Sequence, residues 1–391
     1  CFHMRRQDVI VLNQRYKMKR QSTNIEVKKN NRNYIFRYIC RHGVVSNPDI
    51  SYAVKMSLPT VTQNTRELIE RGLIEETGEL ESTGGRRAKA LSVAANAKLA
   101  AGIDITKNHV GLLLTNLTGE ILGYSRIYFP FSDEDEYYLS VNRKLEKFLD
   151  EIHADREKIL GIGISFPGIV DLDREMIVHS HILGVDSVAF SSVGRFFSYP
   201  CCFLNDANAG AYAEGIRSES MERFFYISLS NTVGGAIFND NELVQGRGFR
   251  CGEVGHMTVM PGGAPCYCGK LGCLDAYCAA SHLSDAADGK LEQFFVRLGQ
   301  GENKIQEIWD KYTDYLAIAI NNIHMILDCD IVLGGYVGSC IDEHIKEIWE
   351  KVSKRNTFTE GSTFVKSCNY RTGAAALGAA LRVVESFIEK I

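Results

Sequence analysis

The residues best suited to chemistry are one histidine and three cysteines in a glycine-rich stretch near the middle of the chain. They are His256, Cys266, Cys268 and Cys273, separated by nine, one and four residues. Free cysteines also pack as small apolar side chains. Three within eight residues, with a histidine upstream, instead match a usual ligand set of tetrahedral zinc. We therefore expect a structural Zn²⁺ bound by these four side chains.

Further polar side chains are placed where a ligand could use them. Glu253 and Asp275 flank the cysteine stretch, and the metal does not need either carboxylate. Ser165 ends one expected strand, and Asn205 and Asp206 follow another. Ligands of α/β proteins bind at the carboxyl ends of strands. Each carboxylate alone could equally cap a helix or lie on the surface, but together the five groups predict a polar pocket beside the metal.

Bulk properties limit the class of protein. A chain of 391 residues predicts two or three domains, and 24% charged residues are typical of a soluble globular protein. The net charge of -4 argues against coating nucleic acid with the whole surface, but it allows a local basic patch. Twelve dispersed cysteines without a secretory leader pattern favour reduced thiols in the cytoplasm. No apolar run is long enough to suggest a membrane span.

The first quarter of the chain has the pattern of a DNA reader. Residues 1–28 are basic and polar, and we expect a mobile arm or a loose leading helix there. An apolar stripe then predicts a helix ended by Gly43, and Ser46 is placed to cap a second helix over about 47–54. A third helix begins near Pro59 and ends before Gly72. This is helix-turn-helix spacing.

The third helix carries the side chains expected to contact DNA. They lie at its N-terminal end and on one polar face: Ser57, Thr60, Thr62, Gln63, Asn64 and Arg66. A merely solvated polar face is the alternative. Two expected strands, 73–76 and 90–93, surround a tip that carries Arg86 and Arg87. Helix-turn-helix plus hairpin is a winged helix, so residues 29–95 predict a domain that binds operator DNA. Replacing both arginines by alanine should weaken that binding.

The remaining chain alternates strands and helices. Strands expected over 99–104, 110–116 and 120–128 are followed by a helix, and a second round begins at about residue 225. Two similar rounds predict a duplicated α/β body with a cleft between its lobes. We expect a first lobe over 96–210, completed by a C-terminal helix over about 375–391, and a second lobe over 211–374 that carries the zinc site.

The motifs GEVGH and CYCGKLGCLD resemble those of the ROK family of repressors and sugar kinases, in particular its transcriptional regulators. The resemblance implies a two-lobed actin-like, hexokinase-type (ribonuclease H-like) body. It implies that sugar hydroxyls are held by five side chains: Asn205, Asp206, Glu253, His256 and Asp275. His256 would bind zinc through one ring nitrogen and the sugar through the other. Asp275 stands where the family usually has Glu.

The resemblance also separates regulators from kinases. A kinase of this type needs glycine-rich hairpins that approach the phosphates. Here the first reads Asp104-Ile105-Thr106-Lys107-Asn108, and in the second only Gly234 and Gly235 remain. We expect Thr106 and Asn231 to crowd a triphosphate. Asp206, at the position of the kinase base, then serves as a sugar ligand.

The sequence thus predicts a sugar-responsive transcriptional regulator, in the sense of a repressor of carbohydrate-utilisation genes. We expect it to act as a homodimer or homotetramer on a palindromic operator. Two alternatives stay open: a sugar kinase that carries a DNA-binding domain, and a regulator that responds to a protein partner.

Overall fold

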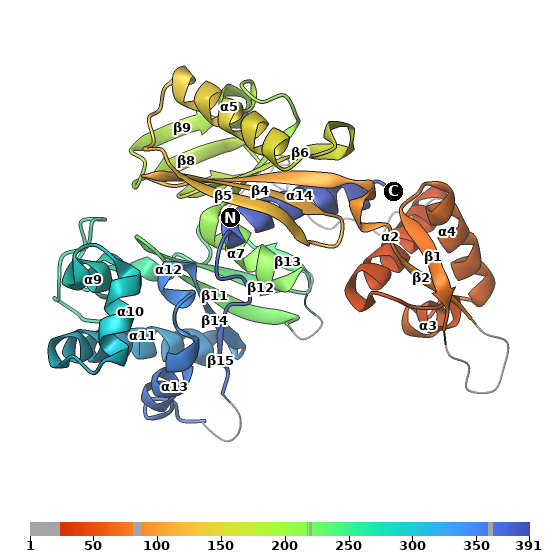
Figure 1. Cartoon of the computed structure of the whole chain (residues 1–391). Coiled ribbons are helices and arrows are strands. Elements are labelled where there is room, and N and C mark those ends of the chain that lie inside the picture. The colour runs from red at the N-terminus through yellow and green to blue at the C-terminus, as the bar shows by residue number, and fades with distance from the viewer. Residues whose placement is uncertain (1–23, 81–87, 217, 219–220, 359–362) are drawn as a thin grey trace, which may run out of the picture. The chain divides into compact units, whose positions relative to one another are not determined.

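The computed structural model describes residues 24–80, 88–216, 218, 221–358 and 363–391. The chain divides into two compact units. One contains the chain up to Ala94 together with Phe387–Ile391, and the other is Ala95–Ser386. Figure 1 shows the elements of both units. The predicted division of the second unit into lobes at residue 210 stays a prediction.

The first unit is a winged helix-turn-helix, as predicted. Its elements are α2 (Asn24–His42), α3 (Asn47–Ala53), α4 (Leu58–Glu70), β1 (Ile74–Glu79) and β2 (Lys89–Val93). The hydroxyl of Ser46 caps α3 by accepting from the Asp49 amide, and the Asp49 carboxylate accepts from the Ser46 amide. β1 and β2 form an antiparallel hairpin.

A small apolar core holds this unit together. It is made by fully buried side chains that repeat at helical spacing: Ile35, Phe36, Ile39, Ile50, Val61 and Leu68. Helix α2 begins at Asn24, inside the stretch that we expected to be an arm or a loose leading helix. No proline or glycine interrupts residues 24–42, so nothing in the sequence ends this helix before His42.

The C-terminus belongs to the first unit. The Arg32 guanidinium pairs with Glu67 at 2.7 Å and donates to the Ile391 carbonyl oxygen at 3.4 Å. We expected the whole of residues 375–391 to complete the first lobe of the body, and for the last five residues that expectation is wrong.

The second unit contains two five-stranded sheets with the same design. The first has the order β10-β6-β3-β4-β5 and the second β13-β12-β11-β14-β15. In each, three antiparallel strands come first in the chain, and two parallel strands are added beside the first of them. The predicted α/β class and duplicated architecture are confirmed.

The first three strands of the body lie close to the ranges predicted for them, whereas β15 was not predicted. Those of the first sheet are β3 (Leu99–Ile105), β4 (His109–Asn116), β5 (Ile121–Tyr128), β6 (Ile159–Phe166) and β10 (Cys201–Asn205). Those of the second are β11 (Arg223–Leu229), β12 (Val233–Asn239), β13 (Glu242–Val244), β14 (Asp330–Gly334) and β15 (Val365–Ser367).

Helices cover both sheets (Figure 1). The longer ones are α5 (Asp135–Glu151), α7 (Asp206–Gly215), α10 (Leu291–Gly299), α11 (Asn303–Leu327), α13 (Ile345–Ser353) and α14 (Ala374–Ile388). The short ones are α6 (Phe190–Gly194), α8 (Asp275–Cys278), α9 (Ser281–Ser284) and α12 (Gly335–Gly338). Helix α5 packs with the first sheet, and α11 packs with the second around the fully buried Trp309.

Helix α14 lies directly on the first sheet, and two glycines allow the close approach. A Cβ at Gly102 of β3 would lie 2.0 Å from the Ala376 carbonyl oxygen, and one at Gly163 of β6 would lie 1.9 Å from that of Ala379. Only glycine fits this distance. The last helix of the chain therefore packs against the first sheet at β3 and β6.

Two features were not predicted. A small antiparallel sheet, β7 (Ile169–Asp171), β8 (Met176–Ser180) and β9 (Val185–Ala189), follows β6. Its strands are short and interrupted by charged residues, so they give little periodic signal. The second feature is the start of helix α7 at Asp206, where the Asn205 side chain caps the helix by accepting from the Asn208 amide at 2.9 Å. Among the described residues, no helix is both long and apolar enough to cross a membrane.

Candidate functional site

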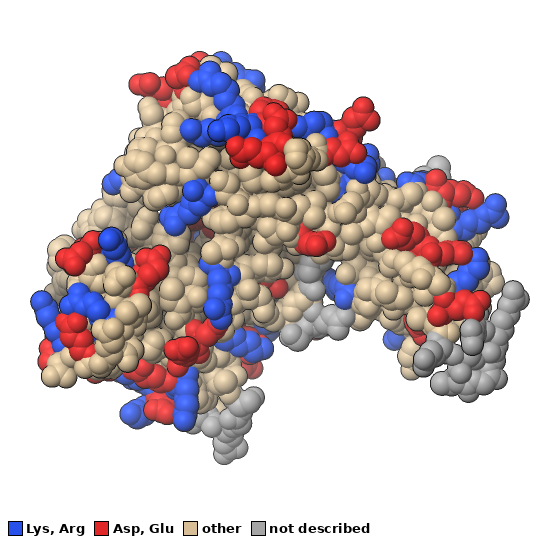
Figure 2. Space-filling view, in the orientation of Figure 1, with Lys and Arg blue, Asp and Glu red and all other residues tan. Residues whose placement is uncertain are grey.

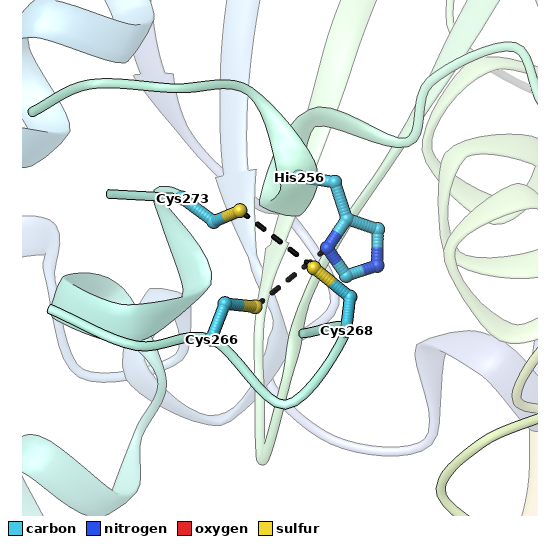
Figure 3. A group of neighbouring side chains, drawn as sticks. All are labelled: His256, Cys266, Cys268 and Cys273. Atoms are coloured by element: carbon cyan, nitrogen blue, oxygen red, sulfur yellow. Dashed lines mark hydrogen bonds between the residues drawn. The ribbon is translucent and has the colours of Figure 1, made fainter. Parts of the chain in front are cut away.

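The four predicted metal ligands lie together in the second unit (Figure 3). Their ligand atoms all lie within 4.8 Å of one another. The Cys268 and Cys273 sulfurs are 3.8 Å apart, and His256 Nδ1 is 3.8 Å from the Cys266 sulfur. Ligands about 2.3 Å from a tetrahedral zinc lie about 3.8 Å from one another, so the four residues fit this metal.

The backbone of the cysteine loop explains why the ligands converge. Two isolated bridges, Thr258 to Cys273 and Pro265 to Leu271, close the loop on itself. Gly272 has φ +77°, and a Cβ there would lie 1.7 Å from the Met260 carbonyl oxygen. Glycine is therefore required at this turn, as the sequence indicated. His256 ends a single 3₁₀ turn, Val254–His256, that holds its ring against the loop.

Two carboxylates predicted to bind sugar lie beside His256. Loss of hydration raises the pKa of Glu253, and the charge of His256 opposes the rise. Burial also raises the pKa of Asp275; the Val233 amide and then His256 oppose it. The Asp275 carboxylate accepts from the Val233 amide at 2.6 Å and is buried. One of its oxygens thus holds the β11–β12 turn, a role that differs from both alternatives considered, a helix cap and a surface position.

Asn205 and Asp206 lie at the junction of β10 and α7. The Asn205 amide donates to the Gly168 carbonyl oxygen and to Asp206, both at 2.9 Å. Burial raises the pKa of Asp206 to about 7, and the charges of Asp104 and then Glu253 add to the rise. Asp206 and Glu253 therefore feel one another's charge, which places the two predicted sugar ligands in one neighbourhood.

Ser165 lies at the end of β6, as expected, but its side chain is not open to a ligand. Its side chain is completely buried, and its hydroxyl donates to the Asp104 carboxylate at 3.0 Å. Burial raises the pKa of Asp104 to about 6 in spite of this bond. Ser165 thus stabilises the Asp104 carboxylate by a hydrogen bond, and a sugar hydroxyl cannot reach the buried Ser165 side chain in this structure. The prediction that it binds sugar directly is corrected on this point.

A cavity of about 440 Å³ lies next to Asp206. Its walls come from the β3–β4 turn, the β11–β12 turn, the start of α7 and the end of β14, and they include Thr106, Asn231 and Asp206. The Thr106 hydroxyl is engaged within its own turn, where it accepts from the His109 amide and donates to its carbonyl oxygen. Thr106 and Asn231 therefore line this space but leave it open.

Arg126 and Tyr336 meet within the lining of this cavity. The Arg126 guanidinium lies 4.8 Å from the centre of the Tyr336 ring and donates to its hydroxyl at 3.1 Å. Arg126 comes from the first sheet and Tyr336 from α12 beside the second, so the pair joins the two sheets. Nothing in the sequence pattern indicated this contact, because the residues are 210 positions apart.

The predicted DNA-reading face of α4 is largely exposed. Ser57, Thr62, Gln63 and Arg66 are open to solvent, and Thr60 is half-buried. Arg66 pairs with Glu70 at 2.9 Å on the surface, a bond that contributes about 0.3–0.5 kcal/mol and can be exchanged for another partner.

Asn64 is a correction. Its side chain is 5% exposed and donates to the Thr60 carbonyl oxygen at 2.8 Å, so it lies on the buried face of α4. It was expected to face DNA because it belongs to the polar residues that crowd the N-terminal half of this helix. One residue is a 100° rotation on a helix, however, and that rotation brings Asn64 to the core side.

Two further residues predicted to contact DNA cannot be compared with this face. Arg86 and Arg87, predicted at the wing tip, lie outside the described residues. Tyr52 near the end of α3 was not singled out from the sequence, yet it is 90% exposed beside the turn into α4. Figure 2 shows Lys and Arg mixed with Asp and Glu over the face in view, without a broad field of one sign.

Comparison with known proteins agrees with both parts of this description. The ROK family model matches residues 100–385, and a model for winged helix-turn-helix DNA-binding domains matches residues 35–75. The xylose repressor of Bacillus subtilis is 26% identical over 377 residues, covering 93% of this chain and 97% of that protein. The N-acetylglucosamine repressor of Escherichia coli O6:H1 is 26% identical over 270 residues, covering 68% and 66%.

A solved structure has the same fold over nearly the whole length. It is a ROK family transcriptional regulator, described as a homologue of the E. coli MLC protein. The TM-score is 0.74 with 21% sequence identity, covering 93% of this chain and 97% of that one.

Proposed function

The chain belongs to the ROK family, and from that premise we propose that it is a sugar-responsive transcriptional repressor. The observation that carries the proposal is the presence, in one chain, of two sites. One is an exposed polar face on α4 of a winged helix. The other is a group of carboxylates close to a histidine whose ring lies beside three cysteine side chains. The first suits operator DNA and the second suits a sugar.

The proposed metal is zinc, bound by His256, Cys266, Cys268 and Cys273. Its role is structural, because four protein ligands leave no open position for a reacting water. His256 Nδ1 faces the cysteine sulfurs, so metal binding there would leave Nε2 protonated as a donor. The metal would thereby fix both the loop and the direction in which His256 can donate.

The proposed effector site contains Asn205, Asp206, Glu253, His256 and Asp275. Carboxylates and an imidazole N–H complement sugar hydroxyls, which both donate and accept. The sheets of the second unit supply these residues from both halves of the duplicated architecture. A sugar that contacts both halves would favour one arrangement of them, and it can shift binding to DNA only by its differential affinity for two states.

The proposal excludes phosphoryl transfer as the main activity. The two glycines that remain in the second hairpin lie in packed surroundings: a Cβ at Gly235 would lie 2.8 Å from the Gly252 carbonyl oxygen, and one at Gly234 would lie 3.1 Å from the Ala207 Cβ. Their presence therefore does not require a bound phosphate. The open cavity beside Asp206 is the observation that keeps a sugar kinase as the second candidate.

Two assays on the full-length protein separate these candidates. Sugar-dependent ATP hydrolysis, measured with xylose, glucose and N-acetylglucosamine at millimolar concentration, should not rise above the rate without sugar. A rise that is abolished by Asp206→Asn would establish the kinase instead. Affinity for a DNA duplex taken from upstream of its own coding region should change when one of the same sugars is added.

The assembly that we propose is a homodimer or homotetramer. Two-fold symmetry would present two copies of α4 to half-sites one helical turn, about 34 Å, or a multiple apart. A palindromic operator is the expected target. Footprinting on the upstream DNA should then show two equal protected half-sites.

A further inference from the structure

Tyr267 occupies a special place in the cysteine loop, between two of the proposed metal ligands. Its hydroxyl lies 3.2 Å from His256 Nε2, and the two rings meet edge to face with centres 5.2 Å apart. Nε2 is the nitrogen that faces away from the cysteine sulfurs. It is therefore the nitrogen that, under the proposed function, donates to the sugar.

The other side of the Tyr267 ring is also occupied. The ring stacks on His181 with centres 4.6 Å apart and planes at 23°. His181 follows directly after β8, in the small sheet that extends from the first five-stranded sheet. The stack thus connects the cysteine loop with a distant part of the second unit, and it orients the phenol toward His256.

The surroundings of Tyr267 are those of the proposed effector site. The carboxylates of Asp275 and Glu253 lie close enough to the Tyr267 side chain for their charges to act on it. A phenol hydroxyl can act as donor or acceptor, as can the sugar hydroxyls that these carboxylates are proposed to bind. The Tyr267 side chain is 39% exposed, so it forms part of the wall of a site and not of a core.

We propose that Tyr267 determines which sugars bind, because it acts as a plug of the effector site. Without sugar, its hydroxyl occupies the position at His256 Nε2 that a sugar hydroxyl would take. This inference rests on the proposed sugar function. A sugar that binds must replace the Tyr267 hydroxyl at Nε2 and turn the ring off His181. Sugars that cannot offer a hydroxyl at that point do not displace the plug and are rejected.

The plug explains why effector binding would change the structure outside the pocket. The Tyr267–His181 stack is a contact between the loop and the small sheet, and a bound sugar breaks it. Because the Tyr267–His181 contact exists only without sugar, it contributes to the free-energy difference between the sugar-free and sugar-bound states. A ligand can shift a conformational equilibrium only through such a difference.

The test compares three zinc-loaded full-length variants with the wild type by isothermal titration with xylose, glucose and N-acetylglucosamine. Tyr267→Phe removes the competing hydroxyl but keeps the ring, and His181→Ala removes the surface that holds the ring. Tyr128→Phe is the matched control, because Tyr128 is an exposed tyrosine on β5. Zinc content is measured for each variant to verify that the loop is intact.

We expect Tyr267→Phe to bind the effective sugar about 2- to 10-fold more tightly, since one hydrogen bond of the sugar-free state is lost. His181→Ala should change affinity in the same direction, and Tyr128→Phe should leave it unchanged. Binding of a sugar by Tyr267→Phe alone would also support the plug.

A second readout follows the ring itself. With 3-fluorotyrosine incorporated, the ¹⁹F resonance missing from Tyr267→Phe identifies Tyr267, and saturating sugar should shift it. Unchanged affinity, weaker affinity, or an unmoved resonance at saturation would overturn the plug while leaving the sugar function in place. If neither the wild type nor any variant binds a sugar although zinc is present, the proposed function fails and the plug fails with it.

Discussion

The imidazole ring of His256 has two proposed roles, one for each of its nitrogens: metal binding and sugar binding. Nδ1 faces the cysteine sulfurs, and Nε2 faces Tyr267 and the proposed sugar site. A metal on Nδ1 fixes the tautomer, because the remaining proton must then sit on Nε2. Under the proposed function, the cysteines would act on sugar binding indirectly, through the orientation and protonation of one histidine.

Cys266→Ser should remove the metal from this cluster. A serine hydroxyl is a poor zinc ligand compared with a thiolate, so zinc content should fall from about one ion per chain to below about half. Elemental analysis after dialysis measures the content, and thermal unfolding should show a lower Tm. Cys201→Ser is the control, because Cys201 lies outside the cluster and donates to the Tyr199 carbonyl oxygen, a bond that serine can keep. Full zinc in Cys266→Ser would contradict the site.

Asp206 should make stability depend on pH. Its pKa is raised from 3.8 to about 7, so the folded protein binds this proton more tightly than the unfolded chain does. The resulting stabilisation is complete below about pH 4 and is lost as the pH rises through 7. Between pH 5.5 and 8 the loss is on the order of 2 kcal/mol.

Asp206→Asn should abolish that part of the pH dependence. Urea unfolding at pH 5.5 and pH 8 measures it, with the exposed Asp173→Asn as the control. An equal loss of stability in Asp206→Asn and the wild type would show that this carboxyl is not the group responsible.

At the scale of elements, we expect the exposed face of α4 to contribute to DNA binding and its buried face to contribute to stability. Gln63→Ala, on the exposed face, should weaken specific binding to the upstream duplex about 5- to 150-fold, corresponding to about 1–3 kcal/mol, and leave unfolding unchanged. Asn64→Ala, on the buried face, should lower the unfolding free energy by about 1 kcal/mol. Fluorescence anisotropy and urea unfolding measure the two effects. Equal DNA affinity of Gln63→Ala and the wild type would refute the reading face.

The contact of α14 with the first sheet depends on glycines, because a side chain at these positions would collide with the helix backbone. Gly102→Ala places a Cβ 2.0 Å from a backbone oxygen, so unfolding should require about 3 kcal/mol less free energy. Gly299→Ala, at the end of α10 with no heavy atom within 4 Å of its Cβ, should be neutral or stabilising by up to about 1 kcal/mol. Equal midpoints in urea would mean that α14 does not approach the sheet this closely.

The sequence predicted most elements of this fold because their patterns are local. Helix caps such as Ser46, the three meander strands of each sheet and the glycine at the Gly272 turn are all read within a few residues. The cysteine cluster was predictable for the same reason. Ser165 and Asn64 were placed wrongly because burial depends on which side of an element packs, and neighbouring positions in the sequence do not report it.

The contacts that were missed join distant parts of the chain. Arg126 with Tyr336, and Tyr267 with His181, are separated by 210 and 86 positions. Tyr267 lies within the CYCGKLGCLD motif, but the motif does not indicate which residue its ring contacts, and the other three residues belong to no motif that the sequence analysis identified. Such pairs follow only from the packing of the whole second unit, so periodicity and spacing carry no sign of them.

For the whole molecule, function requires that sugar and DNA influence one another. By linkage, a sugar that weakens DNA binding is itself bound more weakly by the DNA complex. Coupling of about 1–3 kcal/mol would change either affinity about 5- to 150-fold. Because the proposed DNA contact also involves phosphates, comparison is meaningful only at one fixed salt concentration.

The most direct measurement is the affinity of the purified, zinc-loaded protein for the upstream duplex, by anisotropy at about 150 mM salt, with and without each sugar of a panel of pentoses, hexoses and N-acetyl sugars. The account predicts specific binding that at least one sugar changes by 5-fold or more, and no such change for a scrambled duplex. Specific binding that no sugar alters would contradict the central claim, because the carboxylates around His256 would then have no effector to hold.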